Sequence, residues 1–576
     1  MADYIKLQGF ARHLSKLAPY LVRHKNLPFE PHKVGVLVSG GADSMVMAFL
    51  LQALKHPYIP NQRLFAPKAF TVDHGARPES AAEALQVQRN LQSLGIDSEI
   101  LKLTWSPGEL ENLVKGGFEE VARTRRYQAI ARAARDHEIY NLFAGHHLDD
   151  QTETLLLRLI RNRNPNLLGF LGMAQISAMP CGESILAVRG ESNLLPNGLV
   201  PAKRVATGST TDILVGEKQP YQGQRLLRPL LIFPKQTILS TCSRFSIPYV
   251  DDKTNFDPTF TARNAVRYLR ANYSLPKALT EQDLRALQRS AYNLSQDSQD
   301  RSQHVWDQIV KFRLDSHTGV VKVTLKQFSH LRNSAELRGF SYGMARLFEL
   351  ASPAHSDSWP LLLNNDHTME LARYLSEPQG DSSGTQTAAT ITVRGAVFRL
   401  INEDITNKMV TFMISRGNFR RSEVTAATHI FRLKPTSGET GKDRHSWFLW
   451  DRRFWIGVQS SQQNFLEHIV FRPYQPEDVP AVKAMLETSP NGDKFKRRLD
   501  NSAPGDARFT LPVMTYQGRI VAFPTLAYQF EPSPTFSIRC RVARSRRTTE
   551  FLNDHVFEAK SKTAFTWRPQ EIPANS

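Results

Sequence analysis

The stretch Val34-Gly-Val-Leu-Val-Ser-Gly-Gly-Ala-Asp-Ser-Met-Val-Met-Ala-Phe-Leu-Leu51 decides the fold of the amino-terminal part of this chain. Its first five residues form an apolar, valine-rich run with the length and composition of a buried strand. The run breaks at Ser39-Gly-Gly41, and the apolar residues after it recur at helical spacing. We therefore predict a strand, a glycine turn and a helix, in that order.

The glycine turn has the composition of an anion site. Its two glycines let several backbone N–H groups approach one anion, the hydroxyls of Ser39 and Ser44 add donors, and the helix start adds the positive end of its dipole. The turn matches neither the Walker A loop nor the Rossmann glycine pattern. Asp43 would repel a triphosphate unless a cation lay between them, which implies Mg²⁺ or an amine substrate. The alternative is an ordinary turn in which Asp43 caps the helix.

Length and charge limit the number of domains and the kind of partner that we expect. A chain of 576 residues is too long for one core, so we expect two to four domains. Its 73 Lys and Arg exceed its 55 Asp and Glu, and the resulting charge of +18 suits a polyanion such as nucleic acid. A basic surface that only meets solvent is the alternative. The three cysteines form no Cys-x-x-Cys pair, which argues against a zinc knuckle or an iron–sulfur cluster.

Strand and helix patterns alternate through the first part of the chain. This alternation predicts an α/β fold with a doubly wound parallel sheet, whose ligands lie off the carboxyl ends of the strands. Three polar loops, 39–44, 73–79 and 145–150, follow predicted strands and should converge there. The further elements we expect are strands at 69–72, 98–103 and 140–144 and helices at 79–94, 119–135, 150–160 and 234–245.

Composition suggests where the chain divides. The 31–255 domain should bind nucleotide, and it holds a Gly-, Pro-, Ser- and Thr-rich stretch at 183–224 that we interpret as a flexible insertion. Around it we expect an N-terminal extension over 1–30, a mainly helical domain over 256–376, a linker at 377–389 and a β-rich, basic, RNA-binding region over 390–576. In the last two domains we predict helices at 280–294 and 305–312 and strands at 390–401, 410–415, 447–458 and 509–526.

A second polar stretch, Gly145-His-His-Leu-Asp-Asp-Gln-Thr-Glu-Thr154, follows a predicted strand. If a helix begins near Leu148, Asp149 and Glu153 are neighbours on one face. Two imidazoles and three carboxylates could bind a metal, or they could hold a cationic amine and relay its proton. We favour the amine or nucleotide role, because no further His-Asp cluster supplies the remaining metal ligands.

The predicted helix over 119–135 carries arginines at a spacing that places them on one face. Glu119, Arg123, Arg126 and Tyr127 follow at i, i+4, i+7 and i+8. An ordinary salt-bridged surface helix would have the same pattern. Arginines directed at the crevice would instead stabilise phosphate charge in a transition state.

These motifs resemble a known family. Ser39-Gly-Gly-Ala-Asp-Ser44 resembles the pyrophosphate loop of the ATP pyrophosphatases, which have an adenine nucleotide alpha-hydrolase-like fold. Over about residues 30 to 270, the chain is similar to tRNA(Ile)-lysidine synthase. The blocks that carry this resemblance are Asp73-His-Gly-Ala-Arg-Pro-Glu-Ser80, Ala122-Arg-x-x-Arg-Tyr127, His146-His-x-Asp-Asp-Gln-x-Glu-Thr154, Arg228-Pro-Leu-Leu231 and Arg263-Asn-x-x-Arg267. The long insertion and the divergent helical domain depart from the family pattern.

The resemblance implies a ligase that uses ATP and Mg²⁺. ATP would adenylate C2 of the wobble cytidine in an isoleucine tRNA with a CAU anticodon, and free L-lysine would then displace AMP to give lysidine. It further implies roles for individual residues. The pyrophosphate would lie against Ser39, Gly40, Gly41, Ala42 and Ser44, while Asp43 would place Mg²⁺ or accept a proton. The other implied roles are nucleotide binding by Asp73 and His74, amine binding by His146, Asp150 and Glu153, phosphate stabilisation by Arg123 and Arg126, and tRNA contacts by Arg77, Glu79, Arg228, Arg263, Asn264 and Arg267.

Other functions remain open at this stage. Another tRNA base modifier of the pyrophosphate-loop superfamily, such as a thiolase, would need cysteine pairs that the chain lacks. An inactive RNA-binding relative is a second alternative. We expect a mitochondrial location, with the cytoplasm as the alternative, and no association with a membrane. The sequence leaves the oligomeric state open between a monomer and a homodimer.

Overall fold

The structure of the chain is a computed structural model. The residues that it describes form two compact units. Unit 1 contains the described residues up to 182 together with those of 223–296, and unit 2 contains the described residues from 297 onward. The structure describes residues 3–22, 30–56, 61–75, 79–105, 118–161, 167–182, 223–250, 261–274, 276, 279–315, 317–328, 331, 334–352, 365–376, 390–393, 395–404, 406–430, 446–460, 469–489, 491–530, 536–542 and 564–566.

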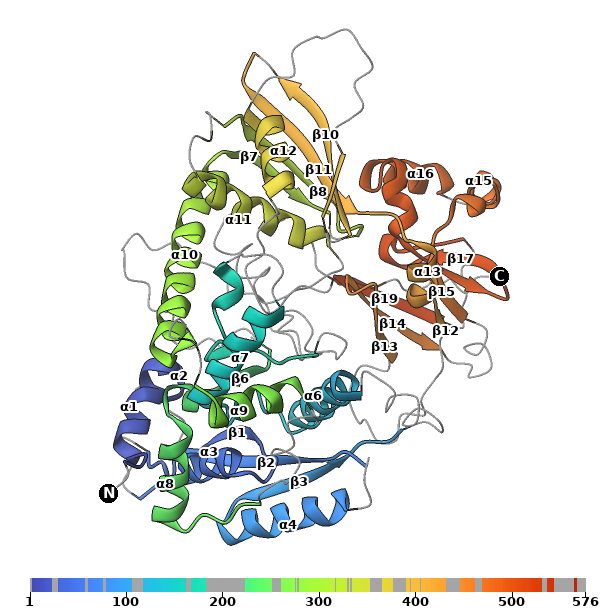
Figure 1. The fold of residues 1–576 in the computed structure, drawn as a ribbon. Coiled ribbons are helices and arrows are strands. Elements are labelled where there is room, and N and C mark those ends of the chain that lie inside the picture. Colours follow the sequence, from blue (N-terminus) through green and yellow to red (C-terminus); the bar gives the residue numbers. More distant parts are fainter. Residues whose placement is uncertain are drawn as a thin grey trace, which may run out of the picture. The chain divides into compact units, whose positions relative to one another are not determined.

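Unit 1 is built on one six-stranded sheet (Figure 1). Five strands are parallel, which confirms the predicted doubly wound parallel sheet. The sixth, β5, pairs antiparallel with β6 at the edge and was not predicted. In spatial order the strands are β3 (Asp97–Lys102), β2 (Phe65–Asp73), β1 (His32–Leu37), β4 (Asn141–Ala144), β6 (Arg225–Leu227) and β5 (Ile176–Ala178).

Helices cover both faces of this sheet, because its strands are apolar on both sides. Val34 and Val36 belong to one core with the helices of the first face, whereas Phe70 and Leu142 belong to a second core with the helix of the other face. The first face holds α1 (Leu7–Leu17), α3 (Ala42–Ala53), α4 (Ser80–Ser93) and α8 (Lys235–Phe245), and the second holds α6 (Phe118–Asp136).

The N-terminal segment predicted as an extension contributes to the core of unit 1. Its amphipathic helix α1 buries Phe10 and Leu14 completely, and α2 (Pro19–Val22) follows it. The Ile5 N–H donates to Thr241 Oγ1 on α8 at 2.9 Å. Residues 3–22 are therefore packed into the nucleotide-binding domain.

Three further helices pack together near the carboxyl end of β4. α7 (Leu148–Arg161) and α9 (Ala262–Asn272) share an apolar cluster with the start of α10 (Glu281–Asp307). α10 begins as predicted, since Thr280 Oγ1 accepts the Asp283 N–H. Most of the predicted insertion, residues 183–222, lies outside the described residues.

The region 256–376 is mainly helical, as predicted, but it also contributes two strands to a sheet of unit 2. α10 ends at Asp307, and residues 309–312, expected to be helical, start a strand. Strands β7 (Ile309–Leu314) and β8 (Val321–Lys326) form one antiparallel sheet with β11 (Met409–Arg416), β10 (Ala396–Asp404) and β9 (Thr390–Val393). The predicted boundary at 377–389 therefore divides one sheet. Its own structure lies outside the described residues.

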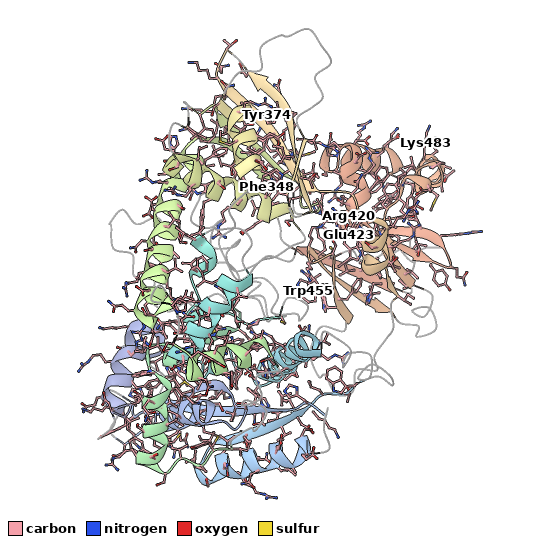
Figure 2. The ribbon with its side chains drawn as sticks, viewed as in Figure 1. Phe348, Tyr374, Arg420, Glu423, Trp455 and Lys483 are labelled. Carbon is pink, nitrogen blue, oxygen red and sulfur yellow. The ribbon has the colours of Figure 1, made fainter. Side chains whose placement is uncertain are left out.

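Two more antiparallel sheets complete unit 2, and they are associated with short helices. Figure 2 labels Arg420 and Glu423 at the start of α13 (Arg421–Ala427), where the Arg420 N–H donates to the Glu423 carboxylate at 2.9 Å. One sheet contains β12 (His429–Ile430), β15 (Ile469–Pro473), β16 (Pro512–Tyr516), β17 (Arg519–Phe523) and β18 (Tyr528–Gln529). The other contains β13 (Ser446–Trp450), β14 (Phe454–Ser460), β19 (Phe536–Val542) and β20 (Ala564–Thr566).

The stretch 447–458, predicted as one strand, is a hairpin. Asp451 and Arg452 both have positive φ angles, 48° and 54°, and they turn β13 back into β14. Aspartate tolerates this left-handed conformation better than most residues, so the turn costs little at position 451. Three charged residues, 451–453, interrupt the apolar run at this turn, and they were the sequence signal of the reversal.

A buried ionic cluster holds this hairpin in unit 2. Asp451 accepts from Arg453 Nε at 2.7 Å and from Arg416 Nε, on β11, at 3.3 Å. Arg453 also donates to the backbone oxygens of Thr318 and Thr510. All three charged side chains are less than a tenth exposed. Arg416, which lies in the basic region predicted over 390–576, is therefore a structural residue.

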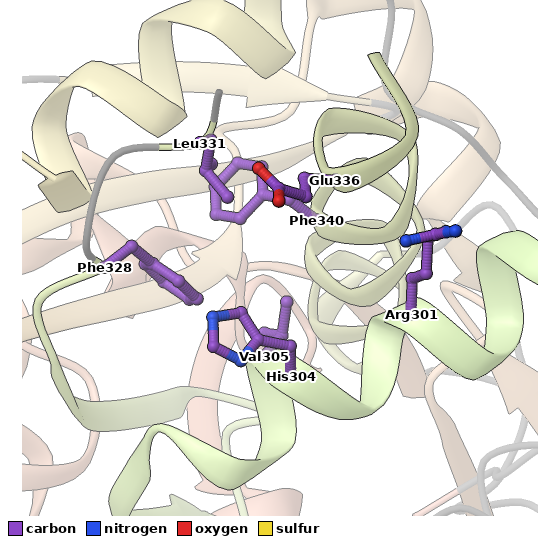
Figure 3. A pocket seen from close by; sticks show the side chains of 7 residues that line it. All are labelled: Arg301, His304, Val305, Phe328, Leu331, Glu336 and Phe340. Atoms are coloured by element: carbon purple, nitrogen blue, oxygen red, sulfur yellow. The ribbon is translucent and has the colours of Figure 1, made fainter. Parts of the chain in front are cut away.

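The packing of α10 against α11 (Ser334–Ala351) leaves a cavity of about 280 Å³ (Figure 3). The two helices approach closely because a Cβ at Gly339 would lie 2.4 Å from Arg301 Cβ, and one at Gly343 would lie 2.8 Å from Val305. α12 (Asn365–Ser376) packs against α11. Aromatic and charged side chains line the cavity: Arg301, His304, Val305, Phe328, Leu331, Glu336 and Phe340.

Among the described residues, none of the helices combines the length and the apolar character that a membrane span requires.

We predict that Arg453→Met will loosen unit 2, because it removes a buried cation from Asp451 and leaves two backbone oxygens unsatisfied. Breaking such a buried pair costs roughly 3–5 kcal/mol. Hydrogen exchange should show faster exchange in β11 and β14 than in the wild type, with no change in α3. The exposed neighbour gives the matched control, Arg452→Met. Equal protection in both variants would contradict the structural role of Arg453.

Candidate active site

The glycine turn after β1 closes against α4. Gly40 has a φ of +93°, and a Cβ there would lie only 2.4 Å from Val87 Cγ2. Gly41 precedes the first residue of α3, whose free N–H groups face the turn. The hydroxyls of Ser39 and Ser44 lie 3.5 Å apart. The loop therefore offers backbone and hydroxyl donors at a helix start, as the sequence predicted for a phosphate.

The loop after β4 lies directly against this turn. A Cβ at Gly145 would be 2.7 Å from the carbonyl carbon and oxygen of Asp43, and 2.8 Å from the Ser44 nitrogen. Only glycine allows this approach, since backbone atoms cannot move aside easily. The approach brings the imidazole of His147 to 3.7 Å from the Asp43 carboxylate. The two strongest sequence motifs thus form one site.

Asp43 is paired with Lys235, a residue that our sequence analysis missed. Lys235 Nζ donates to both carboxylate oxygens of Asp43, at 2.7 and 2.8 Å. The Lys235 backbone N–H, at the start of α8, donates to Asp149 at 2.9 Å. The cation that the sequence required beside Asp43 is therefore supplied by the chain itself in this structure.

Asp73 lies at the carboxyl end of β2 and shapes the next loop. Its Oδ1 accepts from the Ser80 hydroxyl and, at 2.9 Å, from the Gly75 N–H. The hydrogen bond from the Ser80 hydroxyl contributes most to lowering the pKa of Asp73 below its ordinary value, and the bond from Gly75 adds to it. Burial acts in the opposite direction and is outweighed. The neighbouring His74 carbonyl accepts from Trp105 Nε1 at 2.7 Å. Both residues lie on the predicted edge of the sheet, and nucleotide binding by them stays a prediction.

The histidines of the second motif lie just ahead of α7, where His147 is buried and His146 is partly buried. The Nδ1 atoms of His146 and His147 are buried and have no hydrogen-bond partner within the described part of the chain. The His147 N–H donates to Asp150 at 3.0 Å. Burial lowers the pKa of His146 to about 3, so the imidazole is neutral. A neutral ring with a free nitrogen can accept or donate one hydrogen bond to a substrate.

The carboxylates of α7 face arginines of α9. Arg267 donates to Asp150 at 3.1 Å and to Glu153 at 2.8 Å. Arg263 Nε lies 3.7 Å from Glu153, and Arg270 donates to Asp149 at 3.3 Å. Arg263 and Arg267, predicted to follow the RNA backbone, thus also neutralise the carboxylates that we assigned to the amine.

The two inner carboxylates have different environments. Burial alone would raise the pKa of Asp150, but the neighbouring His147 and His146 outweigh it, and the pKa is lowered overall. For Glu153, burial dominates over the opposing Arg267, and the pKa is raised. Glu153 Oε2 accepts no hydrogen bond from the described residues. Of the two, Glu153 is therefore the better proton acceptor near neutral pH.

The remaining predicted arginines differ in exposure. The guanidinium groups of Arg123 and Arg126 lie 5.0 and 5.5 Å from the buried Tyr127 ring. The charges of Arg123, Arg228 and Arg263 all act on His146, which places them around one centre. Arg228, however, is 7% exposed and donates to Ala174 O and Ser177. Burial lowers its pKa, and its surroundings fit a structural role better than a tRNA contact.

For three further residues that we predicted to contact tRNA, the structure adds no supporting observation. Asn264 is buried, and its N–H donates to Thr261 Oγ1 at the start of α9. Glu79 is exposed and precedes α4 without a side-chain capping bond. Arg77 lies outside the described residues.

Among the described residues of the phosphate loop, 39–44, Asp43 is the carboxylate that could bind Mg²⁺. Within the described ranges, no group of three or more His, Cys, Asp or Glu side chains could hold a metal. Mg²⁺ usually binds through one or two carboxylates plus substrate phosphates, and one carboxylate beside two hydroxyls meets that requirement. Lys235 occupies the same carboxylate, so the ion and the ammonium would compete for it.

Spacing along the chain could have revealed Arg270, which our sequence analysis also missed, but not Lys235. Arg263, Arg267 and Arg270 follow at i, i+4 and i+7, which complements the carboxylates at 149, 150 and 153. Lys235 stands at the first position of a helix that the sequence did predict. Its partner is 192 residues away, however, and no local pattern points to it.

Comparison with known proteins agrees with this geometry. A family model for the PP-loop domain matches residues 10–186 and 203–271. The "Probable tRNA(Ile)-lysidine synthase" of Schizosaccharomyces pombe is 27% identical over 92% of this chain and 97% of its own length. The tRNA(Ile)-lysidine synthase of Bradyrhizobium sp. is 34% identical over 39% of this chain, which spans about half (48%) of that relative.

The chain thus contains a PP-loop domain, with its phosphate loop between β1 and α3. The two relatives named above are tRNA(Ile)-lysidine synthases, and the chain is similar to the Schizosaccharomyces pombe protein over nearly its whole length.

We predict that acid will destabilise unit 1 partly through His146. Its folded-state pKa of about 3 lies below the ordinary 6.5, so the unfolded chain binds one more proton between these values. Stability should fall by up to about 1.4 kcal/mol for each pH unit below ~6. Urea unfolding of the wild type and His146→Gln at several pH values measures this. The two curves should run parallel above pH ~7, and equal slopes at pH ~5 would refute the assignment.

Proposed function

We propose that this chain is a lysidine-forming ligase that joins free L-lysine to the wobble cytidine of an isoleucine tRNA with a CAU anticodon. The single observation that supports this most is the contact between Gly145 and Asp43, which unites a phosphate loop with an acidic, imidazole-bearing helix start. An enzyme that activates a base with ATP and then adds an amine needs both parts within one site.

The reaction has two steps. The C2 oxygen of the cytidine attacks the α-phosphorus of ATP, and pyrophosphate leaves. The ε-amine of lysine then attacks C2 and loses a proton, and AMP leaves with the former C2 oxygen. The relatives carry lysidine synthase names, and the PP-loop family match supports the use of ATP.

The phosphate loop would hold the leaving pyrophosphate. Backbone N–H groups at Gly40 and Gly41, with the hydroxyls of Ser39 and Ser44, surround the start of α3 and face negative charge. Lys235 would move from Asp43 to a phosphate oxygen when ATP binds, since phosphate is the stronger anion. Arg123 would add positive charge as pyrophosphate leaves.

The acidic start of α7 would hold the lysine amine. Asp150, with its lowered pKa, stays ionised and attracts the ammonium. Glu153, with its raised pKa and a carboxylate oxygen that lacks a donor, would take the proton as the amine attacks. Its neighbour Arg267 would orient both carboxylates.

Three further points belong to this proposal. We propose Mg²⁺ as the ion that neutralises the ATP phosphates, with Asp43 as its protein ligand. The basic surface of unit 2 would contact the tRNA backbone, as its composition predicts. We also propose a mitochondrial location, which fractionation of cells that express the full chain can test.

The central test is an AMP-release assay with all components. We predict AMP release that requires ATP, lysine and a CAU-anticodon tRNA together. Asp43→Asn should reduce kcat/KM by roughly 100-fold or more, because it removes the charge that orders the phosphate site. Asp97→Asn, which changes an exposed carboxylate on β3 that pairs with Lys68, is the matched control and should remain active. Turnover at the same rate without RNA would instead indicate a small-molecule synthetase.

A second test separates the two carboxylates. We predict that Glu153→Gln will lower kcat by about 10²–10⁴-fold, because the proton of the amine has no acceptor. A rise in pH should partly rescue this variant, since more lysine is then neutral in solution. Asp150→Asn should chiefly raise the KM for lysine. Single-turnover rates from pH 6 to 9 distinguish the two effects, and a pH-independent defect in Glu153→Gln would exclude it as the base.

A further inference from the structure

Two exposed tyrosines lie at the carboxyl end of α9. Tyr268 is 44% exposed and Tyr273 is 60% exposed. Their rings pack edge to face, with centroids 6.3 Å apart and planes at 62°. Neither ring is part of an apolar core cluster of unit 1. Exposed aromatic pairs of this kind hold apolar surface ready for a partner.

The helix that carries this pair is connected to the phosphate loop through Arg270. Tyr268 and Tyr273 flank Arg270, whose guanidinium donates to Asp149 at 3.3 Å. The other oxygen of Asp149 accepts the Lys235 N–H at 2.9 Å, and the Lys235 ammonium binds Asp43. The aromatic pair therefore lies on the helix whose arginines Arg263, Arg267 and Arg270 contact the carboxylates of α7.

The surroundings of the pair suit a nucleic acid better than an apolar protein. Arg263 and Arg267 are each one-third exposed on the same helix, and Arg270 is 21% exposed. Their partly free donors can meet phosphate oxygens while the rings meet bases. Partly exposed arginines beside exposed aromatic rings are the combination that binds unpaired nucleotides.

We infer that Tyr268 and Tyr273 form a stacking platform for an unpaired base of the anticodon loop, next to the cytidine that reacts. This inference rests on the proposed function. A base that enters the site must leave its neighbours in the loop, and those neighbours lose stacking energy. A tyrosine ring on α9 restores part of it, because every base has a π face.

The test uses the full chain and a CAU anticodon stem-loop RNA, with affinity measured by fluorescence anisotropy over a range of salt concentrations. The double variant Tyr268→Ala/Tyr273→Ala should bind about 5- to 100-fold more weakly. Its dependence on salt should not change, because no phosphate contact is lost. Tyr268→Phe/Tyr273→Phe should bind as the wild type does. Tyr292→Ala, which removes a tyrosine 58% exposed on α10, is the matched control.

The outcomes separate this inference from the proposed function. If the wild type forms lysidine but the double Ala variant binds the stem-loop equally well, the platform is refuted and the proposed function stands. A changed oligomeric state in light scattering with unchanged RNA affinity also refutes it, because the rings then contact protein. If the wild type neither binds the stem-loop nor releases AMP with whole tRNA, both proposals fail.

Discussion

The arrangement of the site depends on the absence of a side chain at Gly145. A Cβ at this position would come within 2.7 Å of the Asp43 backbone, so the loop after β4 can reach the first turn of α3 only as glycine. Because this loop continues into α7, the approach also fixes where the imidazoles and carboxylates of α7 lie relative to the phosphate loop. A parallel sheet supplies the common edge, and the glycine closes the remaining gap.

Charge pairing inside the chain explains much of what surrounds that edge. A buried charge is costly unless it is paired, so the carboxylates of α7 require cations. The arginines of α9 supply them for Asp149, Asp150 and Glu153. Unit 2 repeats this principle around Asp451, with Arg416 and Arg453. Some of the 73 Lys and Arg therefore serve the fold, and fewer of them are available to RNA than the composition suggests.

The same pairing gives two chemically similar side chains different properties. Asp150 and Glu153 lie one turn apart and share Arg267. Asp150 also has two imidazoles nearby and accepts a backbone N–H, so its pKa falls. At Glu153 burial outweighs the opposing Arg267, and its pKa rises. One carboxylate is thus suited to hold a cation and the other to take its proton, and no feature of the sequence pattern separates these roles.

The sequence by itself determined the local features: the glycine turn, the helix that follows it, the parallel sheet and the acidic helix start at Leu148. Each depends on residues a few positions apart, whose spacing reflects helix and strand geometry. Only the tertiary structure decided which distant groups meet. It paired Lys235 with Asp43 across 192 residues and joined β7 and β8 to strands beyond residue 389. Those outcomes follow from packing and from the pairing of buried charges, which act through space and leave no local pattern.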